Sequence, residues 1–276
     1  MSKQSTKRYL VVTDLDSSLL DEDYGYSGAV KALELMQSKG VPLVMNSSKT
    51  YAELRNLASE LPECIAMVAE NGGVVSLLGH SALVDECELA DVHGYVNQNL
   101  GRSRDEILVV AHGLRKTQGY SFEGFADWQV SDVVQHTGLS IEGATQAMER
   151  LATEPIHWHG TDSEWEDFTK ALELEQIRAI RGGRFIHLMG MSDKVIGMKS
   201  ISKRYQELEP DCEWIVIAVG DSENDLAMLE AADIALVVPH HDGPKIRPKN
   251  RNTIYASSVG STGWGAGIIE ILTNEI

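Results

Sequence analysis

The sequence is poor in basic residues and cysteine, and it has no long apolar run. Its 24 Lys and Arg residues stand against 41 Asp and Glu residues, so the formal net charge is −17. Nucleic-acid backbones and anionic membrane surfaces bind to clustered positive charge, so we expect neither as a partner. No apolar run approaches the roughly 20 residues that cross a bilayer, and residues 1–8 lack the apolar stretch of a secretory signal. We therefore expect a cytoplasmic protein.

The few cysteines argue against a disulfide framework and against a zinc site. Cys64, Cys87 and Cys212 are odd in number, far apart in the sequence and free of any Cys-x-x-Cys pattern. We predict that they are packing residues. The apolar share of 43% is ordinary for a globular protein, and 276 residues suffice for two domains or one large domain.

Strand-like and helix-like segments alternate at both ends of the chain. Parallel strands need a crossover, which is usually a helix, so we predict an α/β fold with a Rossmann-like, doubly wound parallel sheet. The predicted strands are residues 9–13, 41–45, 65–68, 214–219 and 234–238. The predicted helices run from the cap Ser27 to Gly40, from the capping box of Thr50, over 194–208, over 226–231, and over 268–272 after the glycine-rich stretch 260–267.

The middle of the chain has a mixed α+β character. Here we predict an isolated strand at 107–110, helices at 131–136 and 140–151, and strands at 156–159, 177–181 and 184–188, the last two joined by a turn at Gly182-Gly183. This change of character predicts an α+β domain over residues 82–190. It is inserted into a core that consists of residues 1–81 and 191–276.

Two acidic segments directly follow predicted strands. Asp14 and Asp16 come after the first strand, and Gly220-Asp221-Ser222-Glu223-Asn224-Asp225 comes after the strand 214–219. Parallel sheets bind ligands at the carboxyl ends of their strands, and two acidic strand ends in contact need a cation between them. Each segment alone also fits a turn with an acidic helix cap. Together they predict a magnesium site, or a carboxylate nucleophile with an acid beside it.

Hydroxyl and ammonium groups occur at two further element ends. Asn46-Ser47-Ser48-Lys49 follows the second predicted strand, and Ser192-Asp193-Lys194 begins a predicted helix. Such groups donate hydrogen bonds to the non-bridging oxygens of a phosphate. Taken singly, the serine also fits a helix cap and the lysine a solvated side chain.

In this order, the segments resemble the motifs of the haloacid dehalogenase superfamily of phosphohydrolases. The motifs are Asp14/Asp16, Ser47, Lys194 and Gly220-Asp221-x-x-Asn224-Asp225, and the insert stands where that superfamily carries a Cof-like, C2-type cap domain. Three further segments are similar to the mannosyl-3-phosphoglycerate phosphatase family: Asn46 to Thr50, Glu70-Asn71-Gly72-Gly73, and Arg181 to Met189.

The resemblance implies a role for each motif residue. Asp14 would be the nucleophile that attacks phosphorus, and Asp16 the acid that protonates the leaving oxygen and later activates water. Mg²⁺ would be held by Asp14, the backbone carbonyl of Asp16 and Asp221, with Asn224 and Asp225 in supporting positions. Ser47 and Lys194 would bind the phosphoryl oxygens, which suits a reaction that needs positioning and charge neutralisation.

One position departs from the superfamily pattern. Ser17 stands where the motif Asp-x-Asp-Gly-Thr has glycine, whereas Ser18 keeps the hydroxyl group of threonine. If this position requires a positive φ, the serine adds strain of about 1 kcal/mol.

Few cations are available for an anionic substrate. Besides Lys194 and the metal, we name Ser48 and Lys49 as substrate contacts, and Arg181 and Arg184 as candidates for a bidentate bond to a carboxylate. Both arginines also fit solvated hairpin charges, and His187 fits a packing histidine better than a ligand. The segment 119–127, which contains two phenylalanines, fits either a mobile lip of the cap or an ordinary surface loop.

The leading hypothesis is therefore a magnesium-dependent phosphatase that acts on mannosyl-3-phosphoglycerate, a phosphorylated small molecule, through an aspartyl-phosphate intermediate. The alternatives are a phosphatase of glucosyl-3-phosphoglycerate or sucrose phosphate, a phosphomutase, or a sugar-phosphate-binding protein without activity. The choice between mannose and glucose depends on single hydroxyl groups in the pocket and stays open at this point, as does the oligomeric state.

Overall fold

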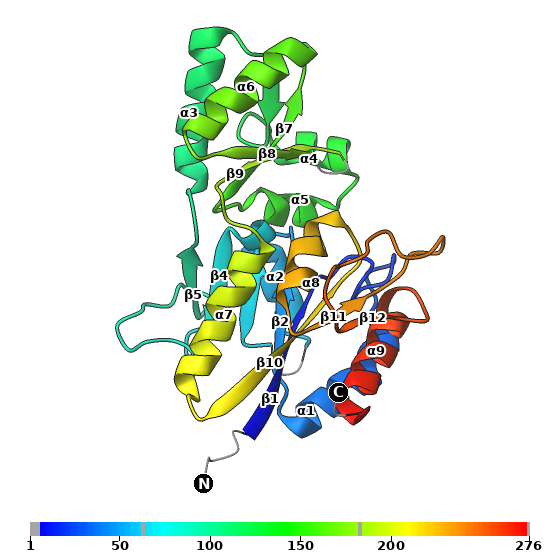
Figure 1. The fold of residues 1–276 in the computed structure, drawn as a ribbon. Coiled ribbons are helices and arrows are strands. Elements are labelled where there is room, and N and C mark those ends of the chain that lie inside the picture. The colour runs from blue at the N-terminus through cyan, green and yellow to red at the C-terminus, as the bar shows by residue number, and fades with distance from the viewer. Residues whose placement is uncertain (1–5, 62–63, 182–183, 275–276) are drawn as a thin grey trace.

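Two β-sheets organise the computed structural model, which describes residues 6–61, 64–181 and 184–274. The larger sheet has the order β12-β11-β10-β1-β2-β3-β4-β5, and the smaller one has the order β6-β7-β9-β8. Figure 1 shows the larger sheet below, with the smaller sheet and its helices above it. No helix in these ranges is both long and apolar enough to span a membrane.

The larger sheet contains strands from both ends of the chain. Its strands are β1 (Thr6–Thr13), β2 (Leu43–Asn46), β3 (Ala66–Ala69), β4 (Val74–Leu78), β5 (Tyr95–Asn99), β10 (Cys212–Gly220), β11 (Ile234–Val237) and β12 (Thr253–Tyr255). Its helices are α1 (Val30–Lys39), α2 (Tyr51–Ala58), α7 (Lys194–Leu208), α8 (Leu226–Ala231) and α9 (Gly260–Asn274). The strands from β12 to β3 pair in parallel, and β4 and β5 are antiparallel.

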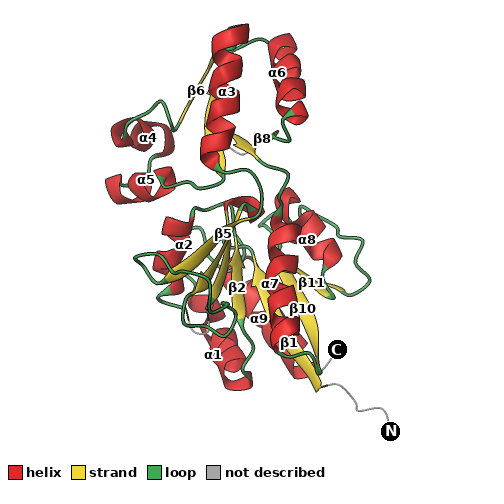
Figure 2. Cartoon of the chain, turned by 90° about the vertical axis from the view of Figure 1, so that its left-hand side faces the viewer, coloured by secondary structure: helices red, strands yellow, loops and turns green. Residues whose placement is uncertain are grey.

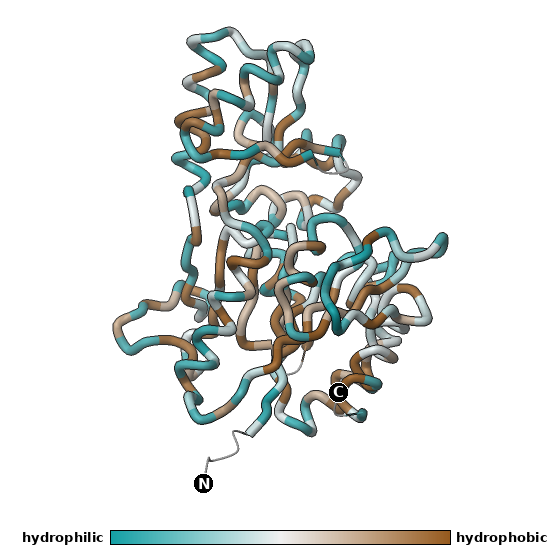
Figure 3. Tube along the Cα trace, in the orientation of Figure 1, coloured by the Kyte–Doolittle hydropathy of each residue, from teal (hydrophilic) through white to brown (hydrophobic). Residues whose placement is uncertain are grey.

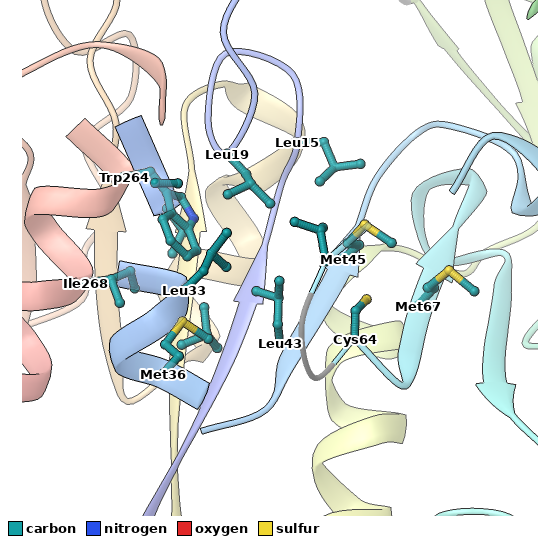
Figure 4. Close-up of a cluster of buried hydrophobic side chains, with 14 of the residues drawn as sticks. Leu15, Leu19, Leu33, Met36, Leu43, Met45, Cys64, Met67, Trp264 and Ile268 are labelled. Atoms are coloured by element: carbon teal, nitrogen blue, oxygen red, sulfur yellow. The ribbon is translucent and has the colours of Figure 1, made fainter. Parts of the chain in front are cut away.

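Helices cover both faces of the larger sheet, as its strand sequences require. In β1, Val11 packs with residues of α1, α2 and α9, whereas Leu10 and Val12 pack with residues of α7 and α8. Figure 4 shows the first of these clusters, with Leu33, Trp264 and other apolar side chains around the strands. Figure 3 shows hydrophobic stretches running through the strands of this sheet. The predicted Rossmann-like, doubly wound α/β fold is thus confirmed.

The smaller sheet lies between two pairs of helices. Its strands are β6 (Phe122–Gly124), β7 (Thr153–Trp158), β8 (Arg178–Arg181) and β9 (Ile186–Met189), and its helices are α3 (Arg104–Gln118), α4 (Val130–Thr137), α5 (Ile141–Met148) and α6 (Asp162–Leu174). One cluster joins α3 and α6 to Ile156 and Leu188, and another joins α4 and α5 to Phe185. Figure 2 shows the two pairs on opposite sides. We call residues 100–192 the cap.

We propose a division of the chain into a core and a cap. The pairing of the strands indicates a different boundary between them from the one predicted. The prediction put the insert at residues 82–190, but β5 pairs with β4 in the larger sheet. We now propose that the first boundary lies near residue 100. The predicted turn at Gly182-Gly183 falls outside the described residues, whereas the flanking strands β8 and β9 do pair antiparallel.

Several local predictions were wrong. Residues 107–110 belong to α3, because Ser103 and Glu106 form a capping box and Gly119 ends the helix in a left-handed conformation. The glycine-rich stretch 260–267 is itself helical, in α9. Its glycines permit close packing that outweighs their low helix propensity, since a Cβ on Gly265 would lie 2.5 Å from the carbonyl oxygen of Gly28.

Two side-chain predictions were also wrong. Ser27 begins a 3₁₀ turn, and no side chain caps α1. Cys64 is buried and Cys212 partly buried, as expected of packing residues, but Cys87 is exposed.

Candidate active site

The two acidic segments lie side by side at one edge of the larger sheet. β1 and β10 pair in parallel with Thr13 beside Val219, so Asp14 and Asp221 both follow the carboxyl ends of adjacent strands. The Asp14 amide donates a hydrogen bond of 2.9 Å to the carbonyl oxygen of Val219. Asp14, Asp221 and Asp225 are buried, and one carboxylate oxygen from each lies within 4.8 Å of the others.

A buried lysine joins two of these carboxylates. Lys194 is the first residue of α7, whose N-cap Asp193 accepts a hydrogen bond from the Ile196 amide. The Lys194 Nζ lies 2.6 Å from Oδ1 of Asp14 and 2.6 Å from Oδ1 of Asp225. The side chain of Lys194 is only 2% exposed. A cation so deeply buried requires partners of opposite charge, and both are present here.

When all three acids are ionised, the cluster carries more negative charge than its lysine compensates. Burial raises the pKa of Asp14 to about 8; Lys194 opposes this shift, while Asp225 and Asp221 add to it. Burial and Asp225 also raise the pKa of Asp221. One lysine therefore does not compensate three buried carboxylates. A divalent cation with a preference for oxygen ligands fits this donor set, because it would supply the missing charge.

Asp221 has partners that the motif did not indicate. Its Oδ1 accepts a hydrogen bond of 3.3 Å from the Ser18 hydroxyl, and its Oδ2 lies 2.7 Å from Nε2 of His240. His240 follows β11, which is parallel to β10, so its strand end reaches the same edge of the sheet. This position after a predicted strand was a signal that the sequence analysis did not use.

Trp264 supports the end of β1, next to Asp14, from behind. Its indole Nε1 donates a hydrogen bond of 2.9 Å to the Thr13 hydroxyl, which in turn donates one of 2.6 Å to the carbonyl oxygen of Asp14. Trp264 is fully buried in α9. The C-terminal helix thus fixes the end of β1.

Asp16 points to a different partner from Asp14. Its Oδ1 forms an ion pair of 3.0 Å with Nζ of Lys49, and its side chain is 48% exposed. Burial alone would lower the pKa of Lys49, but the charge of Asp16 and its hydrogen bond raise it overall. Lys49 also lies over the ring of Tyr24, 4.9 Å from its centroid. Between the two acids, Ser17 has a φ of 61°, so the strain expected there is present.

The loop after β2 lies against the helix of Lys194. Asn46 Nδ2 donates a hydrogen bond of 2.9 Å to the carbonyl oxygen of Lys194. Ser47 is buried, and its Oγ accepts a hydrogen bond of 3.3 Å from the Lys49 amide. Ser48 is half-buried in the same loop. The structure thus brings Ser47, Ser48 and Lys49 to the edge of the sheet that carries the carboxylates.

Asn224 and Asp225 differ in their environment. Asp225 is fully buried, and its Oδ2 accepts hydrogen bonds from the amides of Asp221 and Ser222. Asn224 is exposed; its Oδ1 accepts a hydrogen bond of 2.7 Å from the Ser222 hydroxyl, and its Nδ2 lies 3.5 Å from Oδ1 of Asn71. Asp225 therefore shapes the loop of Asp221 from inside, and Asn224 from outside.

Arg181 and Arg184 make their contacts within the cap. The guanidinium group of Arg181 lies 5.1 Å from the ring centroid of Trp165 in α6. Arg184 donates a hydrogen bond to the carbonyl oxygen of Thr137, which ends α4. Both side chains are exposed. The structure does not show either of them in contact with the carboxylate cluster.

The segment 119–127 is anchored to the rest of the cap. Phe122 and Phe125 are buried, residues 122–124 form β6, and Asp127 forms an ion pair of 2.8 Å with Arg115. These contacts support the expectation of a surface segment with aromatic anchors rather than that of a mobile lip.

His187 packs inside the cap. It lies in β9, and burial together with the charge of Arg150 lowers its pKa to about 3. The ordinary value is 6.5, so this side chain is neutral in the folded protein at moderately acidic pH. This agrees with a packing histidine.

We expect His187 to make the protein less stable in acid. Between about pH 6.5 and about pH 3 the unfolded chain binds a proton that the folded chain does not, so the free energy of unfolding falls as the pH falls. Melting temperatures measured across this window should decline less steeply for His187→Gln than for the unchanged protein. His80→Gln, at an exposed position, is the control. Equal slopes for the protein and for His187→Gln would contradict this assignment.

Three comparisons with known proteins are consistent with this geometry. A family model of haloacid dehalogenase-like hydrolases matches residues 11–113. A glucosyl-3-phosphoglycerate/mannosyl-3-phosphoglycerate phosphatase of Methanococcoides burtonii is 32% identical, over 96% of this chain and 97% of the relative. A protein of the same name from Persephonella marina is 32% identical over 97% of this chain and 98% of the relative.

Solved structures show the same fold. A haloacid dehalogenase-like hydrolase from Bacteroides thetaiotaomicron has a TM-score of 0.65 and 19% identity, and the match covers 96% of this chain and 100% of that one. A protein from Thermoplasma acidophilum has a TM-score of 0.66 and 15% identity, covering 97% and 99% of the two chains.

Proposed function

Because this chain belongs to the mannosyl-3-phosphoglycerate phosphatase family of the haloacid dehalogenase superfamily, we propose that it hydrolyses mannosyl-3-phosphoglycerate to mannosylglycerate and phosphate. Its membership makes it a phosphoric monoester hydrolase that acts on a sugar phosphate. The observation that carries the proposal is the cluster of Asp14, Asp221 and Asp225 around Lys194 at the carboxyl ends of β1 and β10.

Asp14 is the proposed nucleophile. A carboxylate oxygen attacks phosphorus, the bond to the leaving oxygen breaks, and an aspartyl phosphate forms, which water then hydrolyses to free phosphate and Asp14. Lys194 holds Asp14 by a bond of 2.6 Å, which limits the carboxylate to one orientation. The phosphate-binding donors that we propose beside it are Ser47, Ser48, Lys49 and Lys194.

Asp16 is the proposed acid and base. It protonates the leaving oxygen in the first step and takes a proton from water in the second. Its exposed carboxylate lies 3.0 Å from Lys49, so Lys49 is placed to orient it as well as to meet the phosphate. Ser17, with its positive φ, turns the chain between the two acids.

Mg²⁺ is the proposed cofactor. We propose that Asp14, Asp221 and the backbone carbonyl of Asp16 hold it, with Asn224 and Asp225 supporting the loop of Asp221. When bound, the ion neutralises charge on the phosphoryl group and on the carboxylates. Support comes from the uncompensated carboxylates described above and from the oxygen donors that Mg²⁺ prefers.

The glycerate carboxylate of the substrate requires a cation on the cap. We propose Arg181 or Arg184, each of which presents an exposed guanidinium group that can bind a carboxylate in bidentate fashion. In contrast, a cavity of about 330 Å³ is lined by three acidic residues, Asp21, Glu22 and Asp23, and by His240 and His241. The three carboxylates do not favour an anionic substrate, so we place the substrate on the Lys49 side of the site.

The proposed substrate is tested by phosphate release from a panel of sugar phosphates. With Mg²⁺ present, we expect kcat/KM for mannosyl-3-phosphoglycerate to exceed that for mannose 6-phosphate by at least about a hundredfold, because the glycerate carboxylate adds a charged contact worth about 1.5–3 kcal/mol and the second ring adds further contacts. Removal of the metal with EDTA should reduce phosphate release by at least about a hundredfold. Equal rates across the panel would remove the substrate assignment.

Glucosyl-3-phosphoglycerate is the second candidate substrate. The names of both relatives include this compound. The two substrates differ at one hydroxyl group of the sugar, so a pocket without a hydrogen-bonding partner for that group accepts both. The same panel distinguishes the cases, and it also contains sucrose phosphate. A sugar-phosphate-binding protein without activity would bind these compounds and release no phosphate.

A further inference from the structure

A strained turn lies between β3 and β4, beside the candidate active site. Glu70, Asn71 and Gly72 have φ values of 54°, 55° and 91°. Glycine adopts such values freely and asparagine tolerates them, so Glu70 in particular is held in this conformation by its surroundings. The proposed chemistry uses none of the three.

The backbone of this turn contacts the proposed phosphate-binding loop. The Glu70 amide donates a hydrogen bond of 2.9 Å to the carbonyl oxygen of Lys49, and the Asn71 amide donates one of 2.9 Å to that of Ser47. On the other side, a Cβ on Gly72 would lie 1.9 Å from the carbonyl oxygen of Asp193, the residue before Lys194. The turn therefore touches both segments that supply proposed phosphate donors.

The side chain of Glu70 reaches in the other direction, to the cap. It is fully buried, and its carboxylate accepts hydrogen bonds from the Leu151 amide at 2.7 Å, the Ala152 amide at 3.1 Å and the Thr153 hydroxyl at 2.6 Å. Arg150 Nη1 in turn donates a hydrogen bond of 2.7 Å to the Thr153 hydroxyl. A buried carboxylate needs such donors, and all of them belong to the stretch from the end of α5 to Thr153, the first residue of β7.

A further hydrogen bond, from another residue of the core, holds the same part of the cap. The Thr50 hydroxyl, next to Lys49, donates a hydrogen bond of 2.9 Å to the carbonyl oxygen of Gln146 in α5. Residues 146–153 thus rest on the loop 47–50 and on the turn 70–72. Figure 1 shows α5 directly above α2, which begins after Thr50.

We propose that Glu70 is a positioning residue that seats the cap on the phosphate-binding loop. Its backbone fixes the loop of Ser47 and Lys49, and its carboxylate fixes residues 151–153 of the cap. A substrate that contacts both the core and the cap requires a constant distance between them. A small phosphomonoester, which contacts only the core, does not. The contact between Glu70 and the cap does not depend on the proposed function. The expected kinetic effect with a large substrate does rest on the proposed function.

The test is the variant Glu70→Gln, studied in the full chain. Glutamine keeps one acceptor oxygen and turns the other into an NH₂ group, which faces one donor at the Oε1 position or two at the Oε2 position. We expect amide hydrogen exchange at Leu151 and Ala152 to accelerate by at least about tenfold, since hydrogen bonds to a charged group are lost. With mannosyl-3-phosphoglycerate, KM should rise about tenfold, while kcat/KM for p-nitrophenyl phosphate should stay within about twofold.

Glu154→Gln is the matched control. Glu154 is also a buried glutamate, and it accepts hydrogen bonds of 2.7 Å from Arg104 and 2.7 Å from the Ala126 amide, both inside the cap. It should leave exchange at Leu151 unchanged. If Glu70→Gln fails to fold, Thr153→Val removes one donor of the seat and should raise exchange and KM in the same direction.

The proposal that Glu70 seats the cap is overturned if amide hydrogen exchange at residues 151–152 is the same in Glu70→Gln as in the unchanged protein. It is also overturned if Glu154→Gln accelerates this exchange equally. Equal losses with both substrates would overturn the positioning role. If the unchanged protein does not hydrolyse mannosyl-3-phosphoglycerate, the proposed function fails, and the exchange measurement still decides whether Glu70 seats the cap.

Discussion

Replacing Asp14 by Asn is expected to lower kcat by at least about 10⁴-fold, because the variant lacks the oxygen nucleophile on which the covalent step depends. Asn keeps the shape of the side chain and a hydrogen-bond acceptor for Lys194. The measurement is phosphate release under saturating substrate, together with mass spectrometry of acid-quenched protein. The unchanged protein should gain the mass of one phosphoryl group, and the variant should not.

The fold of Asp14→Asn should persist. Lys194 keeps its bond of 2.6 Å to Asp225, and the variant removes one of three buried carboxylates that repel one another. A melting temperature close to that of the unchanged protein would separate loss of chemistry from loss of structure. Asp233→Asn is the control, since Asp233 precedes β11 at the opposite edge of the same sheet and should retain full activity. Substantial turnover by Asp14→Asn would remove Asp14 from its role.

Replacing Lys194 by Ala should reduce both activity and stability. The buried ammonium group compensates Asp14 and Asp225, and removing one partner of a buried ion pair costs about 3–5 kcal/mol. Without Lys194, Asp14 also loses its fixed orientation and the phosphoryl group loses a cationic contact, so we expect kcat/KM to fall by about 10³-fold or more. Urea unfolding and phosphate release measure the two effects.

Two variants make the Lys194 result specific. Lys199→Ala lies in the same helix at an exposed position and should change the free energy of unfolding by less than about 0.5 kcal/mol. Lys194→Arg keeps the charge, but its larger planar group does not fit a site that is 2% exposed, so activity should not return. If Lys194→Ala unfolds at the same urea concentration as the unchanged protein, the ion pairs contribute no net stability.

The alternation of strands and helices could be predicted from the sequence because it has local causes. Apolar runs such as residues 214–219 and caps such as Thr50 act within a few residues of sequence. The predictions went wrong where tertiary contacts outweigh local preference. The stretch 260–267 is helical although it is rich in glycine. The helix packs so closely on the rest of the core that a Cβ on Gly265 would lie 2.5 Å from the carbonyl oxygen of Gly28, and nothing within the segment itself indicates this contact.

The order of the motifs along the sequence also allowed a prediction: it identified residues that meet at one edge of the sheet. Parallel topology places the carboxyl ends of β1 and β10 together, so the approach of Asp14 to Asp221 follows from the pairing of two strands. The proximity of His240 follows from the same rule applied to β11. It was overlooked because a histidine after a strand carries no specific motif.

The sequence by itself determined the α/β fold, the family and the identity of the acidic and basic residues at the strand ends, because these depend on periodicity and on residue type. Only the tertiary structure decided which charges are partners. Lys194 joins Asp14 to Asp225, Asp16 faces Lys49, and Glu70 holds the cap. Such pairings join residues up to 180 positions apart, and their energy depends on distance and burial, which exist only once the chain has folded.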